Sequence, residues 1–324
     1  MNSSDPSIYC LTETELRLSG SNLEYLLYRY LFPPICIAGL FGNAANLLVL
    51  TSRGNRVSRA SSLLACIAVS DCIFLFLLIP HSMASFDFFA FDSSFREIYF
   101  RSKIHLIGIV NWISAIAMWL VVVVSFERVI GVRSPLTLSS HGFLPRLPIT
   151  IAAIISYTAT LTFYQHLAYR CKTKLLCHDT QLVHLCLDVD SDIWPANRTN
   201  PTSEGLRKFV RWTRMAHATG SILLPLALLI VLNSMLLYYV KRRSFFHSNL
   251  SKKVMRRIRV NREQGNSDPL FRRHSESANQ QRTEHRIAVT VCSIVSLFTI
   301  THGPSAVMLT GNIVWNLLFG TTFK

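Results

Sequence analysis

Long uncharged apolar runs alternate with short basic segments along this chain. A helix needs about 20 apolar residues to cross about 30 Å of hydrocarbon, where it satisfies its own backbone hydrogen bonds. Six runs meet this length, and we expect each to form one spanning helix. Their expected bounds are about 31–52, 61–86, 104–128, 147–169, 215–240 and 285–310. The pattern therefore predicts an all-α fold, a polytopic transmembrane helical bundle.

The same pattern divides the chain into three regions. Residues 1–30 read as a tail before the bundle, and residues 31–310 as the bundle itself. Residues 311–324 begin with the turn signal Gly311-Asn312 and are too short to span, so we expect a C-terminal stub there.

Basic residues concentrate in alternate loops. The loops after the first and third predicted helices carry an excess of arginine, and residues 241–286 hold 13 basic and 4 acidic residues, 13 − 4 = +9. Cytoplasmic loops of membrane proteins carry such an excess. The distribution predicts a multi-pass protein of the plasma membrane with an extracellular N-terminus.

Composition excludes several classes of protein. With 50% hydrophobic and 16% charged residues and a mean hydropathy of +0.32, the chain is not a water-soluble domain. The basic residues that give the net charge of +15 lie between the apolar runs. This placement indicates that they orient the chain in the membrane and contact membrane lipid. We therefore expect no nucleic-acid partner. The sequence contains no nucleotide-binding loop, pair of catalytic carboxylates or credible catalytic triad. We expect neither an enzyme nor a bound cofactor.

Four cysteines fall in the predicted outer segments: Cys10, Cys171, Cys177 and Cys186. His178 and His184 lie among the last three, so a zinc site is conceivable. Outside the cell an oxidised pair is favoured, and we predict disulfides and no metal. Three complete pairings exist, between which the sequence does not choose.

Two glycosylation sequons fall on the predicted outer face. They begin at Asn2 and Asn197, which are the candidate glycosylation sites of a glycoprotein.

Charged residues at the membrane suggest a switch. Asp71 is the one acid deep in an apolar segment, and such a carboxylate usually marks function, although a structural hydrogen-bond hub is the alternative. Glu127 and Arg128 stand at the inner end of the third helix, where both side chains could simply reach water. Glu284, at the inner start of the sixth helix, could instead hold Arg128 and close the cytoplasmic side.

Prolines predict bends in two helices. Pro225 in the fifth helix and Pro304 in the sixth each remove a backbone hydrogen bond. Phe298 lies one turn before His302 and shares its face, so this stretch reads as a hinge, with simple core packing as the alternative.

This ordered set of residues resembles a rhodopsin-like (class A) G-protein-coupled receptor over about residues 30–310. The resemblance rests on Gly42-Asn43, Ala68-Val69-Ser70-Asp71, Glu127-Arg128-Val129, Pro135-Leu136, Pro225, Glu284, Phe298 and Pro304. It implies that Arg128 engages a heterotrimeric G protein and that Glu284 is its resting-state partner. It also implies that Pro225, Met118 and Phe298 form a packing trio that transmits ligand binding.

The run from Glu127 to Leu136 is similar to that of invertebrate FMRFamide-type receptors, which implies an extracellular neuropeptide ligand. A signal would then pass by movement of the fifth and sixth helices. Positions that match the family's pocket are polar here, and they are Asn111, Ser114, His217, Ser221, His302 and Ser305.

Several marks of the family are absent. Lys103 stands where a disulfide cysteine is usual, His302 replaces the hinge tryptophan, and no Asn-Pro-x-x-Tyr segment follows. We therefore expect the seventh helix to be missing, through a splice product, an incomplete gene model or degeneration. A non-signalling receptor fragment is the alternative function. A six-helix channel or transporter is less favoured, because no pore loop or paired broken helices are evident.

Overall fold

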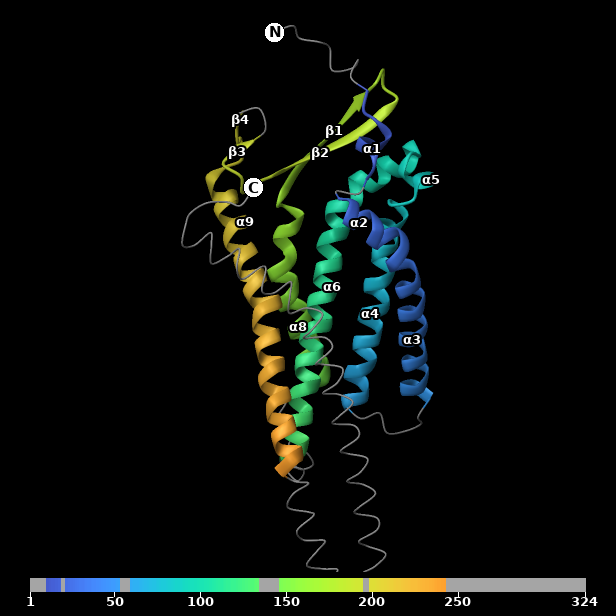
Figure 1. The fold of residues 1–324 in the computed structure, drawn as a ribbon. Coiled ribbons are helices and arrows are strands. Elements are labelled where there is room, and N and C mark those ends of the chain that lie inside the picture. Colours follow the sequence, from blue (N-terminus) through green and yellow to red (C-terminus); the bar gives the residue numbers. More distant parts are fainter. Residues whose placement is uncertain (1–9, 19–20, 53–58, 134–145, 195–197, 243–324) are drawn as a thin grey trace, which may run out of the picture. The chain divides into compact units, whose positions relative to one another are not determined.

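The computed structural model describes residues 10–18, 21–52, 59–133, 146–194 and 198–242 (Figure 1). Within them, five helices are long and apolar enough to cross a membrane: 22–52, 59–83, 93–133, 147–166 and 204–242. The predicted fold, a helical membrane bundle, is confirmed. The predicted sixth helix and the stub 311–324 lie outside the described residues.

The described residues contain both long and short helical elements. They are α1 (Glu13–Leu16), α2 (Asn22–Leu26), the π-helix η2 (Leu27–Leu31), α3 (Phe32–Ser52), α4 (Arg59–Met83), α5 (Asp87–Ala90), α6 (Ser93–Arg133), α8 (Leu147–Thr162), the 3₁₀-helix η3 (Phe163–His166), α9 (Glu204–His217) and the π-helix η5 (Ala218–Leu223). Helical structure continues from η5 through residues 224–242.

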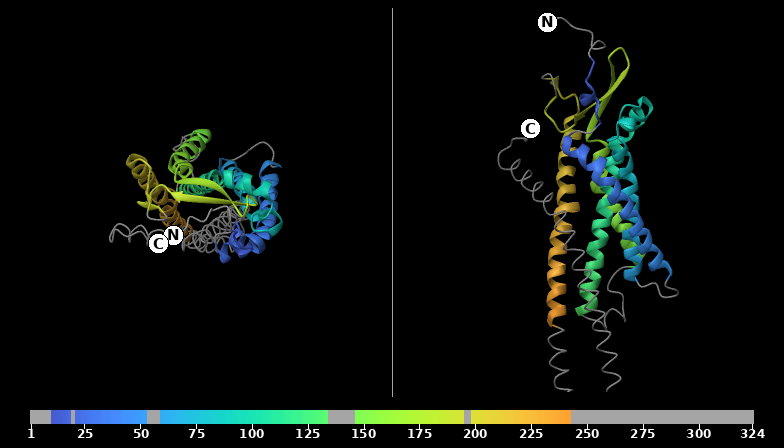
Figure 2. Two further views of the ribbon diagram at one scale, coloured as in Figure 1. Left: turned by 90° about the horizontal axis from the view of Figure 1, so that it is seen from above. Right: turned by 45° about the vertical axis from the view of Figure 1, so that its right-hand side comes forward.

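The first two spanning helices pack side by side (Figures 1 and 2). Gly39 on α3 allows this approach, because a Cβ there would lie 2.7 Å from Cδ1 of Leu75 on α4. On the same helix, Ile37 and Phe41 are 71% and 77% exposed. Large exposed apolar side chains suit a surface that faces lipid rather than water.

The third spanning helix, α6, extends beyond both ends of the expected segment 104–128. It begins after Asp92, whose carboxylate accepts the N–H of Phe95 at 2.7 Å, as a helix N-cap does. In contrast, α4 ends at Met83, before the end of its apolar run, a few residues after the internal Pro80. Apolar length alone therefore misplaces the ends of these helices.

The chain divides into two compact units. The first contains the chain as far as Leu120 together with Leu147–Ser221, and so includes the beginning of α6 and of the fifth spanning helix. The second contains Val121–Arg146 and the chain from Ile222 onward. In its described part, apolar residues such as Leu229 and Leu236 are fully buried.

A β-hairpin follows the fourth spanning helix, and the apolar pattern does not predict it. Strands β1 (Tyr169–Leu176) and β2 (Gln181–Asp188) pair antiparallel, and a separate two-residue ladder joins β3 (Ile193–Trp194) to β4 (Arg198–Thr199). Cys177, His178 and Asp179 in the turn have φ of 55°, 53° and 65°. Three consecutive left-handed residues reverse the chain within a short loop.

Candidate ligand-binding and signalling site

Two disulfides shape the hairpin end of the first unit. Cys171 and Cys186 are opposite each other in the strand register and are bonded, and Cys10 is bonded to Cys177 in the turn. The predicted disulfide cysteines are confirmed, and the structure selects one of the three pairings. Near the Cys10–Cys177 disulfide, the side chain of Gln181 donates to Leu11 O at 3.0 Å and accepts from Leu11 N at 2.8 Å. The N-terminal segment is thus joined to the hairpin covalently and by hydrogen bonds.

The zinc alternative for these cysteines does not fit the residues present. Ligand atoms of Cys171, His184 and Cys186 lie within 4.8 Å of one another, but both sulfurs belong to one disulfide and offer no thiolate. Burial, and secondarily the charge of Lys103, lower the pKa of His184 from its usual range. Both effects favour the neutral form of this imidazole.

Arg96 is a buried cation that joins three segments. It is 5% exposed, and its guanidinium donates to the carbonyls of Leu16 (2.8 Å), Ala90 (2.6 Å) and Leu182 (2.7 and 3.2 Å). These carbonyls belong to the end of α1, to α5 and to β2. The planar fork of an arginine can satisfy several acceptors at once, so one side chain fixes the tail, a helix and the hairpin.

Ion pairs hold the other end of the hairpin to α9. Arg214 binds both carboxylate oxygens of Asp188, at 3.0 and 3.1 Å, and Arg211 binds Asp190 at 2.8 Å. Single surface pairs contribute little, whereas a two-oxygen contact within a network is better defined. The network fixes the end of β2 against α9, the first part of the fifth spanning helix.

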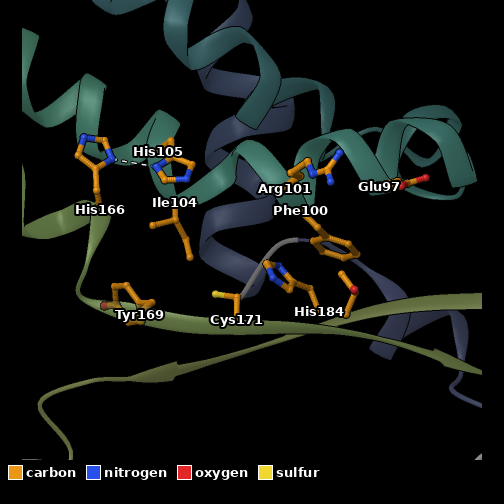
Figure 3. Close-up of a pocket in the computed structure, with 10 residues that line it drawn as sticks. Glu97, Phe100, Arg101, Ile104, His105, His166, Tyr169, Cys171 and His184 are labelled. Carbon is orange, nitrogen blue, oxygen red and sulfur yellow. Dashed lines mark hydrogen bonds between the residues drawn. The ribbon is translucent and has the colours of Figure 1, made fainter. Parts of the chain in front are cut away.

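A pocket of about 370 Å³ lies between the start of α6, η3 and the hairpin (Figure 3). Its wall presents both signs of charge, from Glu97 and Arg101, together with the aromatic rings of Phe100 and Tyr169. Three histidines complete the polar part of the wall: His105, His166 and His184. Such a wall suits a small ligand with both charged and apolar groups.

The polar residues predicted to bind ligand have different surroundings. Asn111 on α6 donates its side-chain N–H to Oε1 of Gln165 at 2.7 Å, so it holds α6 to η3. Ser114 is half-buried on α6. His217 is half-buried at the end of α9, with its ring 5.8 Å from that of the buried Tyr164. Of these residues, the structure places only Asn111 in a polar side-chain pair.

The π-helix η5 forms a close contact with α6 and α8. Trp119 on α6 donates its indole N–H to Gly220 O at 3.2 Å and packs edge-on against Tyr157 of α8. Pro225 lies five residues after Gly220 and has no backbone N–H that could donate to the Gly220 carbonyl. The indole N–H of Trp119 supplies this carbonyl with a donor instead. Ser221 is 2% exposed, and its hydroxyl has no hydrogen-bond partner in the described part of the chain.

Gly220 should not tolerate a side chain. A Cβ there would lie 2.7 Å from Oη of Tyr157 and 2.8 Å from Cδ1 of Leu161, so Gly220→Ala forces these side-chain ends or η5 itself to shift. We expect a loss of about 1–3 kcal/mol, as for other overpacked cores. Thermal unfolding of the purified protein measures it. Gly205→Ala is the matched control: it lies in the first turn of α9 with nothing within 4 Å, and it should be neutral or slightly stabilising. Equal midpoints for the two variants would refute the close contact.

The predicted switch residues are only partly within the described residues. Met118 and Glu127 are buried on α6, and Asp71 is half-buried on α4. Arg128 is half-buried in the second unit, with an Nε that is buried and unpaired in the part of the chain described. Pro225 is fully buried. The other predicted positions lie outside the described residues: Asn2, Asn197, Glu284, Phe298, His302, Pro304 and Ser305.

Comparison with known proteins identifies the family. Residues 30–268 match the family described as the serpentine type 7TM GPCR chemoreceptor Srw. The chain belongs to this family. The Srw receptors are G-protein-coupled receptors of the membrane and not enzymes, as the sequence predicted.

Similar proteins occur in Caenorhabditis elegans. "Putative G-protein coupled receptor F59B2.13" is 36% identical over 92% of this chain and 65% of its own length. "Sex peptide receptor-related protein 2" is 25% identical over 89% of this chain and 59% of its own. "Probable G-protein coupled receptor B0563.6" is 27% identical over 72% of this chain and 52% of its own. This Srw receptor chain therefore spans less than two thirds of the length of these relatives.

Several structural residues of the site were not predicted. Arg96, Trp119 and the pair His105 and His166 act across long sequence separations, and no local pattern marks them. The ion-pair network did leave a signal. Acids recur every second residue at 188, 190 and 192, as at the end of a strand, and arginines recur at 207, 211 and 214 with helical spacing.

Proposed function

We propose that this Srw receptor binds an extracellular peptide, a neuropeptide in particular, and activates a heterotrimeric G protein from the plasma membrane. The N-terminus would lie outside the cell with the hairpin. Two disulfides at this end support that orientation, because disulfides persist in oxidising compartments. The excess of arginine and lysine in the alternate loops supports it as well.

The pocket under the hairpin is the observation that carries the ligand class. Arg101 can pair with a carboxylate and Glu97 with an amine, while Phe100 and Tyr169 offer rings to apolar side chains. A short peptide carries all three kinds of group. The name of one relative, "Sex peptide receptor-related protein 2", is in keeping with this class.

The signalling step would use the fifth and sixth helices. The fifth contains the π-helix η5, and π-turns often occur at functional sites because they loosen the regular helix. Arg128 would be held by Glu284 in the resting state and released to the G protein in the active state. A ligand can cause this only by binding the active state more tightly than the resting state.

A peptide panel tests the ligand class. Cells that express the receptor with a G-protein reporter should respond to at least one peptide, and Glu97→Gln and Arg101→Gln should each reduce its potency. A hydrogen bond to a charged group contributes roughly 1.5–3 kcal/mol, which corresponds to about tenfold or more. Lys174→Gln, at an exposed position of β1 that does not line the pocket, is the control and should retain potency. Full potency in both pocket variants would exclude this pocket as the peptide site.

A further inference from the structure

Two histidines from distant parts of the chain meet in the wall of the pocket (Figure 3). Nδ1 of His105 on α6 and Nδ1 of His166 on η3 are 3.0 Å apart and share one hydrogen bond. The two rings are stacked, with centroids 5.2 Å apart and planes 27° apart. His105 is exposed and His166 half-buried, so both can be reached from the pocket.

The position of His166 is fixed by a glycine. A Cβ on Gly108 would lie 2.8 Å from Cε1 of His166 and 3.2 Å from both ring nitrogens, so the ring occupies the space that a side chain would fill. Gly108 is three residues after His105 and lies on the same face of α6. Phe163, one turn before His166, packs edge-on against the imidazole, with the two ring centroids 6.0 Å apart. Both ligand atoms are therefore held by regular elements, which is the requirement for a preorganised site.

We propose that His105 and His166 bind one divalent transition-metal ion through their Nδ1 atoms. Zn²⁺ binds imidazole nitrogen at about 2.0–2.1 Å with tetrahedral angles, which places two nitrogens about 3.3 Å apart. The pair needs to open by only a few tenths of an ångström to reach this separation. On binding, the imidazole that donates the hydrogen bond moves its proton from Nδ1 to Nε2. Both rings then ligate as neutral imidazoles, and two waters of the ion are displaced.

The pocket supplies the remaining requirements of a metal site. Its volume of about 370 Å³ leaves room for the waters that complete the coordination. Imidazole nitrogen favours Cu²⁺ and Zn²⁺, whereas Mg²⁺ prefers oxygen ligands. With two protein ligands the site is of the open kind, in which water or a group of a bound ligand fills the other positions. This inference does not depend on the proposed peptide ligand.

Titration of the full chain in nanodiscs with ZnCl₂ tests the site by calorimetry. We expect a binding step of one Zn²⁺ per chain that His105→Gln and His166→Gln each weaken at least tenfold. His178→Gln, in the exposed turn of the hairpin, should leave this step unchanged, and MgCl₂ should produce none. Gly108→Ala keeps both imidazoles but displaces His166, so it should also weaken binding. Binding equal to wild type in both histidine variants would overturn the proposal.

A second measurement needs no variant. Diethyl pyrocarbonate modifies accessible imidazoles, and mass spectrometry of the wild-type protein locates the modified residues. Zn²⁺ should protect His105 and His166 and leave His178 reactive. Unchanged modification of His105 and His166 in saturating Zn²⁺ would show that the pair is a hydrogen-bonded packing contact only.

Discussion

Arg128→Ala should abolish ligand-stimulated G-protein activation without lowering the amount of receptor at the cell surface. Arg128 lies on α6 in the second unit, and its Nε is buried without a partner among the described residues. We expect it to contact the G protein as a central interface residue. Loss of such a hot-spot contact costs at least about 2 kcal/mol, or roughly thirtyfold in affinity.

Arg133→Ala is the matched control for Arg128→Ala. Arg133 is also a cation of α6, but it is exposed in the last turn. Its removal should change activation by no more than about twofold, because exposed charges contribute little. Equal losses in the two variants would indicate a general effect of charge at this end of the helix, rather than a specific contact of Arg128.

Arg96→Ala should remove most of the folded receptor from the cell surface. The guanidinium is the shared donor to the carbonyls of Leu16, Ala90 and Leu182, and its loss leaves these acceptors without it. The contact with Ala90 is buried, and an unsatisfied buried group costs about 1–3 kcal/mol, whereas the contacts with Leu16 and Leu182 are half-buried and each costs less. The combined loss is a large fraction of the roughly 5–15 kcal/mol that stabilises a typical domain.

Surface labelling and thermal unfolding measure this effect. Arg96→Lys should be intermediate, since one ammonium group cannot reproduce the planar fork. Arg170→Ala, at an exposed position of β1, should behave as wild type. If Arg96→Ala reached the surface at the wild-type level and unfolded at the wild-type temperature, Arg96 would not hold the three segments together.

The bundle was predictable because the membrane imposes one strong rule. Every spanning segment must be apolar and helical, so five of the predicted segments correspond to described helices. The ends of the helices follow other rules. The N-cap at Asp92 extends α6 well beyond its apolar run. The pattern of apolar residues carries no information about such local hydrogen bonds.

The site was predictable only where the type of a single residue indicates its role. The four outer cysteines implied disulfides, but their pairing required the strand register that opposes Cys171 to Cys186. Asn111 was predicted as a ligand-binding residue of the third helix, whereas its hydrogen-bond partner Gln165, 54 positions away, was not predicted. His105 and His166 are 61 positions apart, and only the packing of η3 over Gly108 brings them together. Contacts of this range depend on the packing of helices, which one sequence does not specify residue by residue.

The central claim is that this receptor activates a G protein when a ligand binds outside. The direct measurement is nucleotide exchange on purified heterotrimeric G proteins by the receptor in nanodiscs, with and without a peptide found by the panel. The account predicts that the peptide accelerates exchange on at least one Gα class in wild-type receptor and not in Arg128→Ala. Saturable peptide binding with no acceleration of exchange on any Gα class would contradict it.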